Sequence, residues 1–226
     1  MLELKNLRYR WPGAHADCLD LPQLSVATGR TLFLYGPSGC GKSTLLGLLA
    51  GVLVAQQGSV SLLGQSWAAL SGGRRDARRA DHVGVVFQQF NLLPYLSVLD
   101  NVLLPCRFSP LRARRCAGSP QAAASSLLQR VALPAVAWER PAAALSVGQQ
   151  QRVAAARALI GQPELVIADE PTSAVDAVLR DDFMALLLGE CRASGSTLVF
   201  VSHDERLAEQ FDERQSLPEL NRAAAA

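Results

Sequence analysis

Short apolar runs alternate with helical patterns along this chain, and the alternation indicates its fold class. Thr31–Tyr35, Val83–Phe87, Leu165–Ala168 and Thr197–Val201 are runs of four or five mostly apolar residues, as in buried strands. The stretch Val178–Arg192, which lies between the last two runs, has a helical pattern without proline. Buried strands that alternate with helices predict an α/β protein whose parallel sheet is covered on both faces.

The segment 89–161 has a different texture. It is rich in proline, arginine and alanine, and Leu127 and Val131 fall at helical spacing. We therefore expect one domain over residues 1–226, in which 1–88 and 162–222 form the core and 89–161 forms an inserted helical subdomain.

The composition indicates the size of the domain and argues against one class of partner. With 226 residues, 49% of them hydrophobic, the chain is long enough for one large domain with a buried core. Its net charge of +2 is too small for a protein that binds nucleic acid by neutralising phosphates, so we expect no nucleic-acid partner.

The N-terminus and the cysteines bear on the cellular compartment. Met1–Lys5 contains an acidic residue and leads into no apolar signal region. The longest apolar run, Leu45–Ala55, is about half as long as a membrane-spanning helix. The five cysteines form no CxxC or similar spacing, so neither a disulfide framework nor a zinc site is predicted. We expect a protein of the reducing cytosol.

The clearest chemical signal runs from Gly36 to Ser43 and matches the pattern GxxxxGK[ST] in full. It follows an apolar run and precedes a leucine-rich stretch, the strand–loop–helix context of a phosphate-binding loop. Glycines let backbone N–H groups turn toward phosphate oxygens, and the following helix adds its positive N-terminus. Lys42 is expected to reach the β- and γ-phosphates, and the Ser43 hydroxyl to bind Mg²⁺.

Two adjacent carboxylates, Asp169 and Glu170, end the apolar run that begins at Leu165. Successive strand side chains point to opposite faces, so the two carboxylates have different roles. Downstream of a phosphate loop, Asp169 is expected in the Mg²⁺ shell, and Glu170 is expected to face the attacking water as general base.

Ser146 and Gln149 have the form of a capping box, which begins a helix. A capped helix alone does not explain Gly148 in the first turn, where glycine costs about 1 kcal/mol relative to alanine. A glycine lets a ligand approach backbone N–H groups, and a helix N-terminus favours an anion. We therefore expect a phosphate to bind here.

In order and spacing, these motifs resemble those of the ABC ATPase family across nearly the whole chain. The matching residues are Trp11 as the aromatic that stacks on adenine, Gly36–Thr44 as the phosphate loop, Gln88 as the Q-loop glutamine, Leu145–Gln149 as the signature LSGGQ, Leu165–Glu170 as the acidic strand, Ser173–Asp176 as the D-loop and His203 as the switch histidine. Val147 departs from the family because it replaces the first glycine of the signature. Since Ser146 and Gly148 remain, we expect activity to survive.

The resemblance implies a P-loop NTPase fold, with a RecA-like, mostly parallel sheet, an N-terminal antiparallel portion and a helical subdomain that carries the signature. It implies a site for ATP and Mg²⁺. The residues expected to bind ATP are Trp11, Gly36, Pro37, Ser38, Gly39, Cys40, Gly41, Lys42, Ser43, Thr44, Ser146, Gly148 and Gln149. Those expected to hold Mg²⁺ are Ser43, Gln88 and Asp169, and those expected to act in hydrolysis are Glu170, His203, Gln88 and Lys42.

The resemblance also implies a mechanism. Two copies, or two paired cassettes, face each other head to tail, and each ATP lies between the phosphate loop of one copy and Ser146 and Gly148 of the other. ATP binding closes the dimer and hydrolysis opens it. This motion drives integral membrane permease subunits, with the chain attached peripherally to the cytoplasmic face of the inner or plasma membrane.

The stretch Val83–Val102 is most similar to cassettes of lipoprotein-release and macrolide-export systems, which pair with separate permeases. A cassette of a polar amino-acid importer is the alternative. A soluble ABC ATPase of translation or DNA repair is less favoured, because no second cassette and no long coiled coil is present. The presence of Gln88, Glu170 and His203 argues against a non-hydrolysing subunit.

Some features have more than one interpretation. The family resemblance favours Phe87–Tyr95 as part of the groove that receives the permease. Two basic runs are either solvated faces or contacts for anionic headgroups or a membrane subunit; they are Arg74, Arg75, Arg78 and Arg79, and Arg112, Arg114 and Arg115. His15 and His82 have no partner pattern, and we expect both to be ordinary surface or loop residues.

Overall fold

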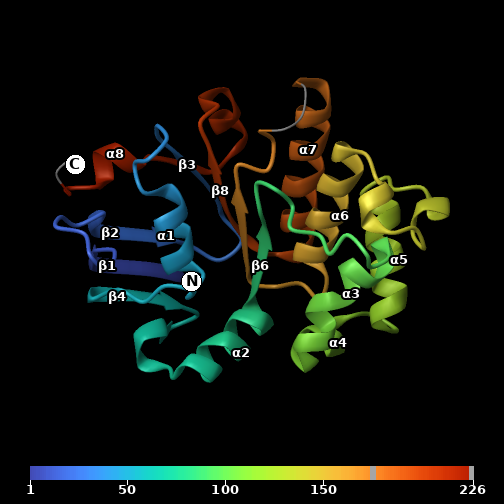
Figure 1. Ribbon diagram of the computed structural model, residues 1–226, viewed down its shortest axis with the longest axis horizontal. Coiled ribbons are helices and arrows are strands. Elements are labelled where there is room, and N and C mark those ends of the chain that lie inside the picture. The colour runs from blue at the N-terminus through green and yellow to red at the C-terminus, as the bar shows by residue number, and fades with distance from the viewer. Residues whose placement is uncertain (174–176, 224–226) are drawn as a thin grey trace. The chain divides into compact units, whose positions relative to one another are not determined.

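The computed structural model describes residues 1–173 and 177–223, which fold into two compact units (Figure 1). Unit 1 comprises residues 1–79 and the chain from residue 199 onward, and unit 2 comprises residues 80–198. Among the described residues, no helix combines the length and the apolar character needed to cross a membrane.

Unit 1 contains an antiparallel sheet with one buried face. Its strand order is β2-β1-β4-β5, with β1 at Leu2–Tyr9, β2 at Leu19–Val26, β4 at Gln57–Leu62 and β5 at Gln65–Ser66. Burial alternates along β1 because successive strand side chains point to opposite faces. The register shifts between Lys5 and Arg8, and this irregularity keeps Leu7 on the buried face after two exposed residues.

The strands next to the phosphate loop also belong to unit 1. Here the strand order is β8-β3-β9, with β3 at Thr31–Tyr35, β8 at Thr197–Ser202 and β9 at Glu213–Ser216, and β3 pairs with β9 in parallel. Helix α1 (Lys42–Leu49) follows β3, most of α2 (Gly72–His82) lies in this unit, and α8 (Leu217–Leu220) is near its end. The rings of Phe33, Phe200 and Phe211 form a cluster in which each contacts the other two, with centroids 5.2 to 6.1 Å apart.

Unit 2 combines parallel strands with a cluster of helices. Strands β6 (Val83–Val86) and β7 (Leu165–Asp169) pair in parallel, and β8, which begins in this unit, neighbours β7. The helices are α3 at Val98–Phe108, α4 at Pro110–Arg115, α5 at Pro120–Arg130, α6 at Val147–Leu159 and α7 at Ala177–Ser194. Helix α3 packs against α4, α5 and α6, as Figure 1 shows.

This architecture confirms the predicted α/β fold class, with parallel strands, an N-terminal antiparallel sheet and helices. The four apolar runs are strands whose observed ends lie within one residue of the predicted ones. Helices α3 to α6 all lie within the segment predicted to be helical. The division into a core and a subdomain at residues 89–161 stays a prediction.

Candidate nucleotide-binding site

The loop between β3 and α1 in unit 1 has the backbone conformation of a phosphate cradle. Gly39 and Gly41 have φ angles of +82° and +100°, which residues with a Cβ rarely adopt. At Gly41 an added Cβ would also lie 2.8 Å from Leu19 Cδ2. Gly41 is the N-cap of α1 and has no side chain to cap the first N–H groups. The positive N-terminus of this helix suits an anionic ligand such as phosphate.

Lys42 folds back over the same loop. Its side chain is 7% exposed, and its Nζ donates hydrogen bonds to the carbonyl oxygens of Gly36 and Pro37, both at 2.9 Å. A phosphate oxygen is a stronger partner for an ammonium group than a neutral carbonyl is. The loop thus holds the lysine where an incoming phosphate can bind it.

Trp11 lies beside this loop. Its Nε1 donates to Thr44 Oγ1 at 3.3 Å, and its ring, which is 45% exposed, meets Tyr9 edge-on at 5.3 Å between centroids. Trp11 lines a pocket of about 540 Å³, a volume within the range of small-molecule sites. Gln56 holds the adjacent backbone, because its side chain accepts from Arg10 N at 3.0 Å and donates to Arg10 O at 2.8 Å. Unit 1 therefore brings Trp11, the residue predicted to stack on adenine, close to the phosphate loop.

His203 follows β8 in unit 1 and its side chain is exposed. Strand β8 neighbours β3, the strand that leads into the phosphate loop. The turn after the strand is held by a hydrogen bond from Asp204 N to Ser202 Oγ at 3.0 Å. The predicted histidine and the phosphate loop thus follow neighbouring strands.

In unit 2, Asp169 is the last residue of β7 and Glu170 follows it, and both side chains are partly buried. Glu170 has a φ of +43°, which is uncommon for a residue with a Cβ. Such backbone strain concentrates at functional sites. Gln88 is exposed two residues beyond β6, which pairs with β7 in parallel. The carboxyl ends of parallel strands lie at the same edge of a sheet. Gln88 and the two carboxylates therefore lie at the same edge.

The capping box predicted at the start of α6 is present. Ser146 N donates to Gln149 Oε1 at 3.1 Å, and Gln149 N donates to Ser146 Oγ at 3.4 Å. An added Cβ at Gly148 would meet only Leu179 Cδ1, at an ordinary contact distance of 3.8 Å, among the described residues. Packing within the described residues therefore does not require a glycine here. Val147, next to it, is 48% exposed.

The other end of α6 is held by a buried arginine, which the sequence showed only as a member of a basic run. Arg112 of α4 is 2% exposed, and its guanidinium donates to Ile160 O at 2.7 Å, Ala158 O at 2.6 Å and Val83 O at 3.4 Å. It supplies donors to carbonyls that the last turn of a helix cannot satisfy itself. Burial lowers the pKa of Arg112 to about 10. The same contact region is tight, because a Cβ on Gly84 would lie 2.2 Å from Ala158 O.

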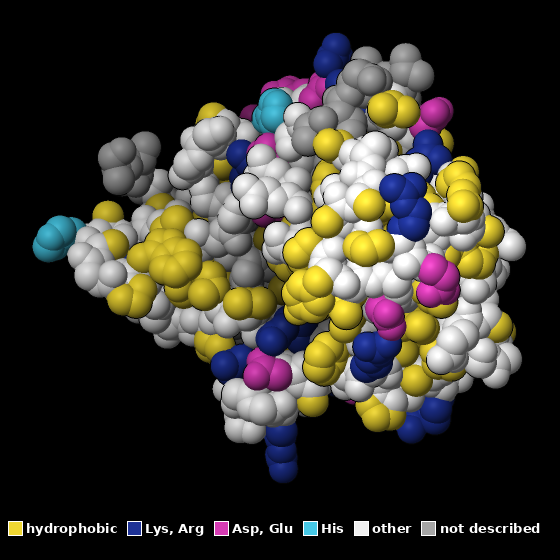
Figure 2. Space-filling view, turned by 45° about the vertical axis from the view of Figure 1, so that its right-hand side comes forward, with side chains coloured by type: hydrophobic (Ala, Val, Ile, Leu, Met, Phe, Trp, Pro, Cys, Tyr) yellow, Lys and Arg dark blue, Asp and Glu magenta, His cyan; other side chains and the backbone are white. Residues whose placement is uncertain are grey.

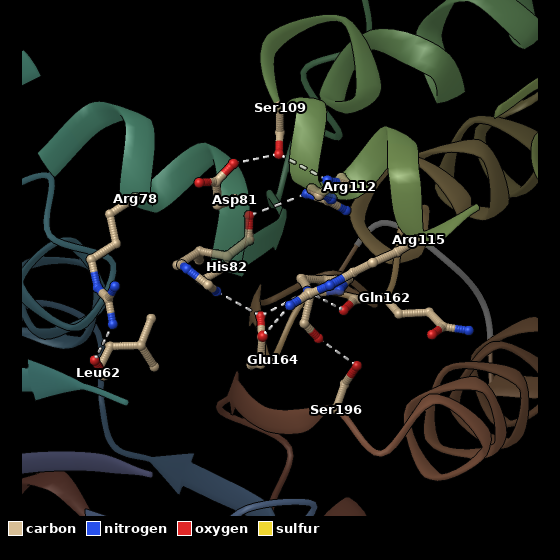
Figure 3. A network of polar contacts seen from close by, with 12 residues as sticks. Leu62, Arg78, Asp81, His82, Ser109, Arg112, Arg115, Gln162, Glu164 and Ser196 are labelled. Carbon is tan, nitrogen blue, oxygen red and sulfur yellow. Dashed lines mark hydrogen bonds and ion pairs between the residues drawn. The ribbon is translucent and has the colours of Figure 1, made fainter. Parts of the chain in front are cut away.

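The start of β7 is fixed by a polar network around Glu164 (Figure 3). Arg115 Nη2 lies 2.6 Å from Glu164 Oε1, and His82 Nδ1 lies 2.9 Å from Glu164 Oε2. Burial opposes ionisation of Glu164, but the hydrogen bonds from His82 and Arg115 outweigh it and lower its pKa to about 2. Ser196 Oγ donates to the neighbouring Pro163 O at 2.6 Å. The strand that carries the two carboxylates is thus anchored at its opposite end.

These contacts correct two sequence-based interpretations. His82 is partly buried and paired with Glu164, so the prediction of an ordinary surface residue was wrong, because its partner lies far away in the chain. In addition, each basic run contains an arginine whose side chain makes contacts within the protein and is not simply solvated. In the first, Arg78 donates to Leu62 O at 2.8 Å within unit 1; in the second, Arg112 is buried.

The segment Phe87–Tyr95 carries an exposed aromatic side chain at each end. Phe87 and Tyr95 are 40% and 75% exposed. Hydrophobic side chains reach the surface in several places on the face drawn in Figure 2, with basic and acidic side chains between them. The segment is tied to α6, because Arg157 donates to Phe90 O and Asn91 O, both at 2.6 Å. Of the predicted D-loop, Ser173 is exposed, and residues 174–176 lie outside the described residues.

Comparison with known proteins identifies relatives over most of the chain. A family profile described as ABC transporter matches residues 19–173. The ABC transporter ATP-binding protein YbbA of Escherichia coli K12 is 44% identical over 190 residues, which are 84% of this chain and 81% of YbbA. The lipoprotein-releasing system ATP-binding protein LolD of Novosphingobium aromaticivorans is 38% identical over 217 residues, covering 94% of this chain and 93% of LolD. The macrolide export ATP-binding/permease protein MacB of Chromobacterium violaceum is 36% identical over 93% of this chain, which matches 32% of MacB.

Solved structures agree with these relatives. The dimeric structure of the bacterial cassette MJ0796 superposes with a TM-score of 0.85 at 33% identity, covering 99% of this chain and 97% of that one. A dimeric post-hydrolysis structure of MJ0796, bound to ADP and inorganic phosphate, gives a TM-score of 0.84 at 33% identity over 96% of this chain and 94% of that one. The P-loop NTPase fold predicted from the sequence is thereby confirmed.

Proposed function

Because the chain belongs to the ABC transporter family, we propose that it powers an export-type transporter with separate membrane subunits, through ATP-driven closure of a head-to-tail dimer. The chain is an ATPase subunit. Its match to LolD extends over 93% of that protein, whose name places it in a lipoprotein-releasing system. This supports a release or export system in which the permease is a different chain.

The observation that carries the dimer proposal is the open space at Gly148. The N-terminus of α6 is capped by Ser146 and Gln149, yet Gly148 beside it has room for a Cβ among the described residues. A glycine that packing does not require, at the positive end of a helix, suits close approach of a phosphate. In the proposed dimer that phosphate is the γ-phosphate of an ATP held by the phosphate loop of the other copy.

Within this site each residue has a proposed role. Glu170 accepts the proton of the attacking water, and His203 hydrogen-bonds the γ-phosphate and orients the water. The Ser43 hydroxyl and the Asp169 carboxylate are hard oxygen ligands that suit Mg²⁺, and with Gln88 they would hold the ion. When bound, Mg²⁺ neutralises the developing charge on the phosphates. Loss of the γ-phosphate removes the charge-assisted contacts between the two copies, and the dimer opens.

The membrane subunit is proposed to bind at the segment Phe87–Tyr95. Its exposed aromatic side chains favour a partner surface, since aromatic residues are enriched at protein interfaces. Binding there would hold the chain at the cytoplasmic face of the membrane that contains the permease.

A complementation experiment tests the head-to-tail arrangement. Two copies with different affinity tags are purified as heterodimers, one carrying Lys42→Ala and the other Gly148→Asp. In a head-to-tail dimer, one site combines the Lys42→Ala loop with the Gly148→Asp helix and lacks both groups. The second site combines the intact Lys42 of one copy with the intact Gly148 of the other. We expect this heterodimer to hydrolyse ATP, whereas either single variant alone is inactive.

The matched control places both substitutions in one copy and pairs it with the wild-type copy. Each composite site is then damaged once, and we expect no hydrolysis. If each site were built within a single copy, the two heterodimers would show the reverse pattern. That reversal, or an inactive first heterodimer, would count against the proposal.

Trp11→Ala is expected to raise the Michaelis constant for ATP about tenfold, which corresponds to loss of one base-stacking contact. Turnover at saturating ATP should change much less, because the ring contacts the base and not the reacting phosphates. Steady-state kinetics measure both, with Trp11→Phe as the control that keeps an aromatic face. A drop in turnover with an unchanged Michaelis constant would reject adenine stacking.

A further inference from the structure

Two cysteines with no recognisable spacing lie side by side in unit 2. Cys106 is in the last turn of α3, and Cys116 is the C-cap of α4. Their Sγ atoms are 3.7 Å apart, so the thiols are in contact without being bonded. A disulfide needs the sulfurs to approach to about 2.05 Å, a small movement at the end of a six-residue helix.

Both thiols are partly buried, but they differ in their position relative to a cavity. Cys116 lines a cavity of about 440 Å³ in unit 2, together with Arg115, Arg130 and Gln162, whereas Cys106 does not line it. A cavity of this size admits a small molecule. Glu190 lines it too and pairs with Arg130 at 2.8 Å, so the cavity offers polar groups of both charges to a peptide-like reagent.

The local environment also separates the roles of the thiols. Burial, together with the neighbouring Cys116, raises the pKa of Cys106 to about 12, so Cys106 stays protonated near neutral pH. Cys116 Sγ lies 3.3 Å from the carbonyl oxygen of Arg112. A reagent in the cavity therefore meets Cys116, and the Cys106 thiol lies within 3.7 Å of it as the second group.

We propose that Cys106 and Cys116 form a redox modification site that exchanges with low-molecular-weight disulfides such as glutathione disulfide. Cys116, as thiolate, attacks one sulfur of glutathione disulfide; the S–S bond breaks, and one glutathione leaves as a thiolate and is protonated. Cys106 then gives up its proton and attacks the Cys116 sulfur of the mixed disulfide, which releases the second glutathione. The protein loses two electrons and two protons, and one glutathione disulfide becomes two glutathione thiols.

The resulting bond would join the last turn of α3 to the C-terminal end of α4. This helix carries Arg112, which holds the C-terminal end of α6. The modification therefore acts on the support of the helix whose other end bears the signature residues, and it does not depend on the proposed dimer or permease.

The test uses the purified full chain and glutathione disulfide as the probe. After exposure, free thiols are alkylated and the protein is digested with trypsin, which cleaves after Arg107 and Arg115 and so places the two cysteines on different peptides. Mass spectrometry of the wild-type protein should find these peptides linked, and dithiothreitol should separate them. Cys191, which is fully buried, serves as the internal control that stays reduced.

Single variants test the order of reaction. Cys106→Ser should accumulate one glutathione on Cys116, because the resolving thiol is gone. In Cys116→Ser, Cys106 should remain reduced over the same time. The proposal is overturned if the wild-type protein forms no link between the two peptides, or if Cys106 in the second variant takes up glutathione as fast as Cys116 does in the first.

Discussion

Glu170→Gln is expected to lower ATP turnover by a factor of about 10³, within the range for loss of a general base. ATP binding should persist, because the phosphate loop with Lys42 and the signature helix with Gly148 are untouched. The variant should therefore accumulate as an ATP-bound dimer that does not open. Single-turnover kinetics measure the chemical step, and gel filtration with ATP measures the dimer.

Two comparisons make this result specific. Glu139 is exposed in unit 2, and Glu139→Gln changes an equivalent charge away from the proposed site, so turnover should equal that of the wild type. Asp169→Asn should impair turnover without trapping the dimer, since it removes a proposed Mg²⁺ ligand needed for the bound state. If Glu170→Gln hydrolyses ATP at the wild-type rate, or stays monomeric with ATP, Glu170 is not the base.

Arg112→Met is expected to lower the free energy of unfolding by about 3 kcal/mol or more, because it leaves buried carbonyl groups without donors. The carbonyls of Ile160, Ala158 and Val83 each lose a hydrogen bond to a charged group. For a chain of this length the unfolding midpoint should fall by about 10 °C. Thermal and urea unfolding, followed by circular dichroism, measure the change.

The same helix supplies the control for this prediction. Arg114 is exposed, and Arg114→Met removes an equal charge without disturbing a buried contact, so its midpoint should stay close to that of the wild type. Equal midpoints for the Arg112 and Arg114 variants would show that the buried guanidinium does not hold α6.

The sequence predicted those parts of the fold and site that depend on short-range chemistry. The capping box at Ser146 and Gln149 spans three residues and could be recognised directly. The phosphate loop could be recognised for the same reason, since its glycines and Lys42 are neighbours in the chain. The strand ends followed from apolar runs bounded by turn residues.

The supports of the site could not be predicted in this way. Arg112 binds carbonyls of residues 46 and 48 positions away, and His82 pairs with Glu164 across 82 positions. Backbone carbonyls exist at every residue, so a sequence carries no sign of which ones an arginine will contact. The contact between Cys106 and Cys116 depends in turn on how α3 and α4 pack.

Arg157 has a consequence for how force passes through unit 2. It joins the carbonyls of Phe90 and Asn91 to the last turn of α6, and a guanidinium with two short bonds is a stiff link. A force applied to the segment Phe87–Tyr95 is therefore transmitted to the whole helix, because its hydrogen-bonded turns resist stretching. Ser146 at its tip then shifts as the segment shifts, so mechanical load applied at one surface alters the position of a group at another.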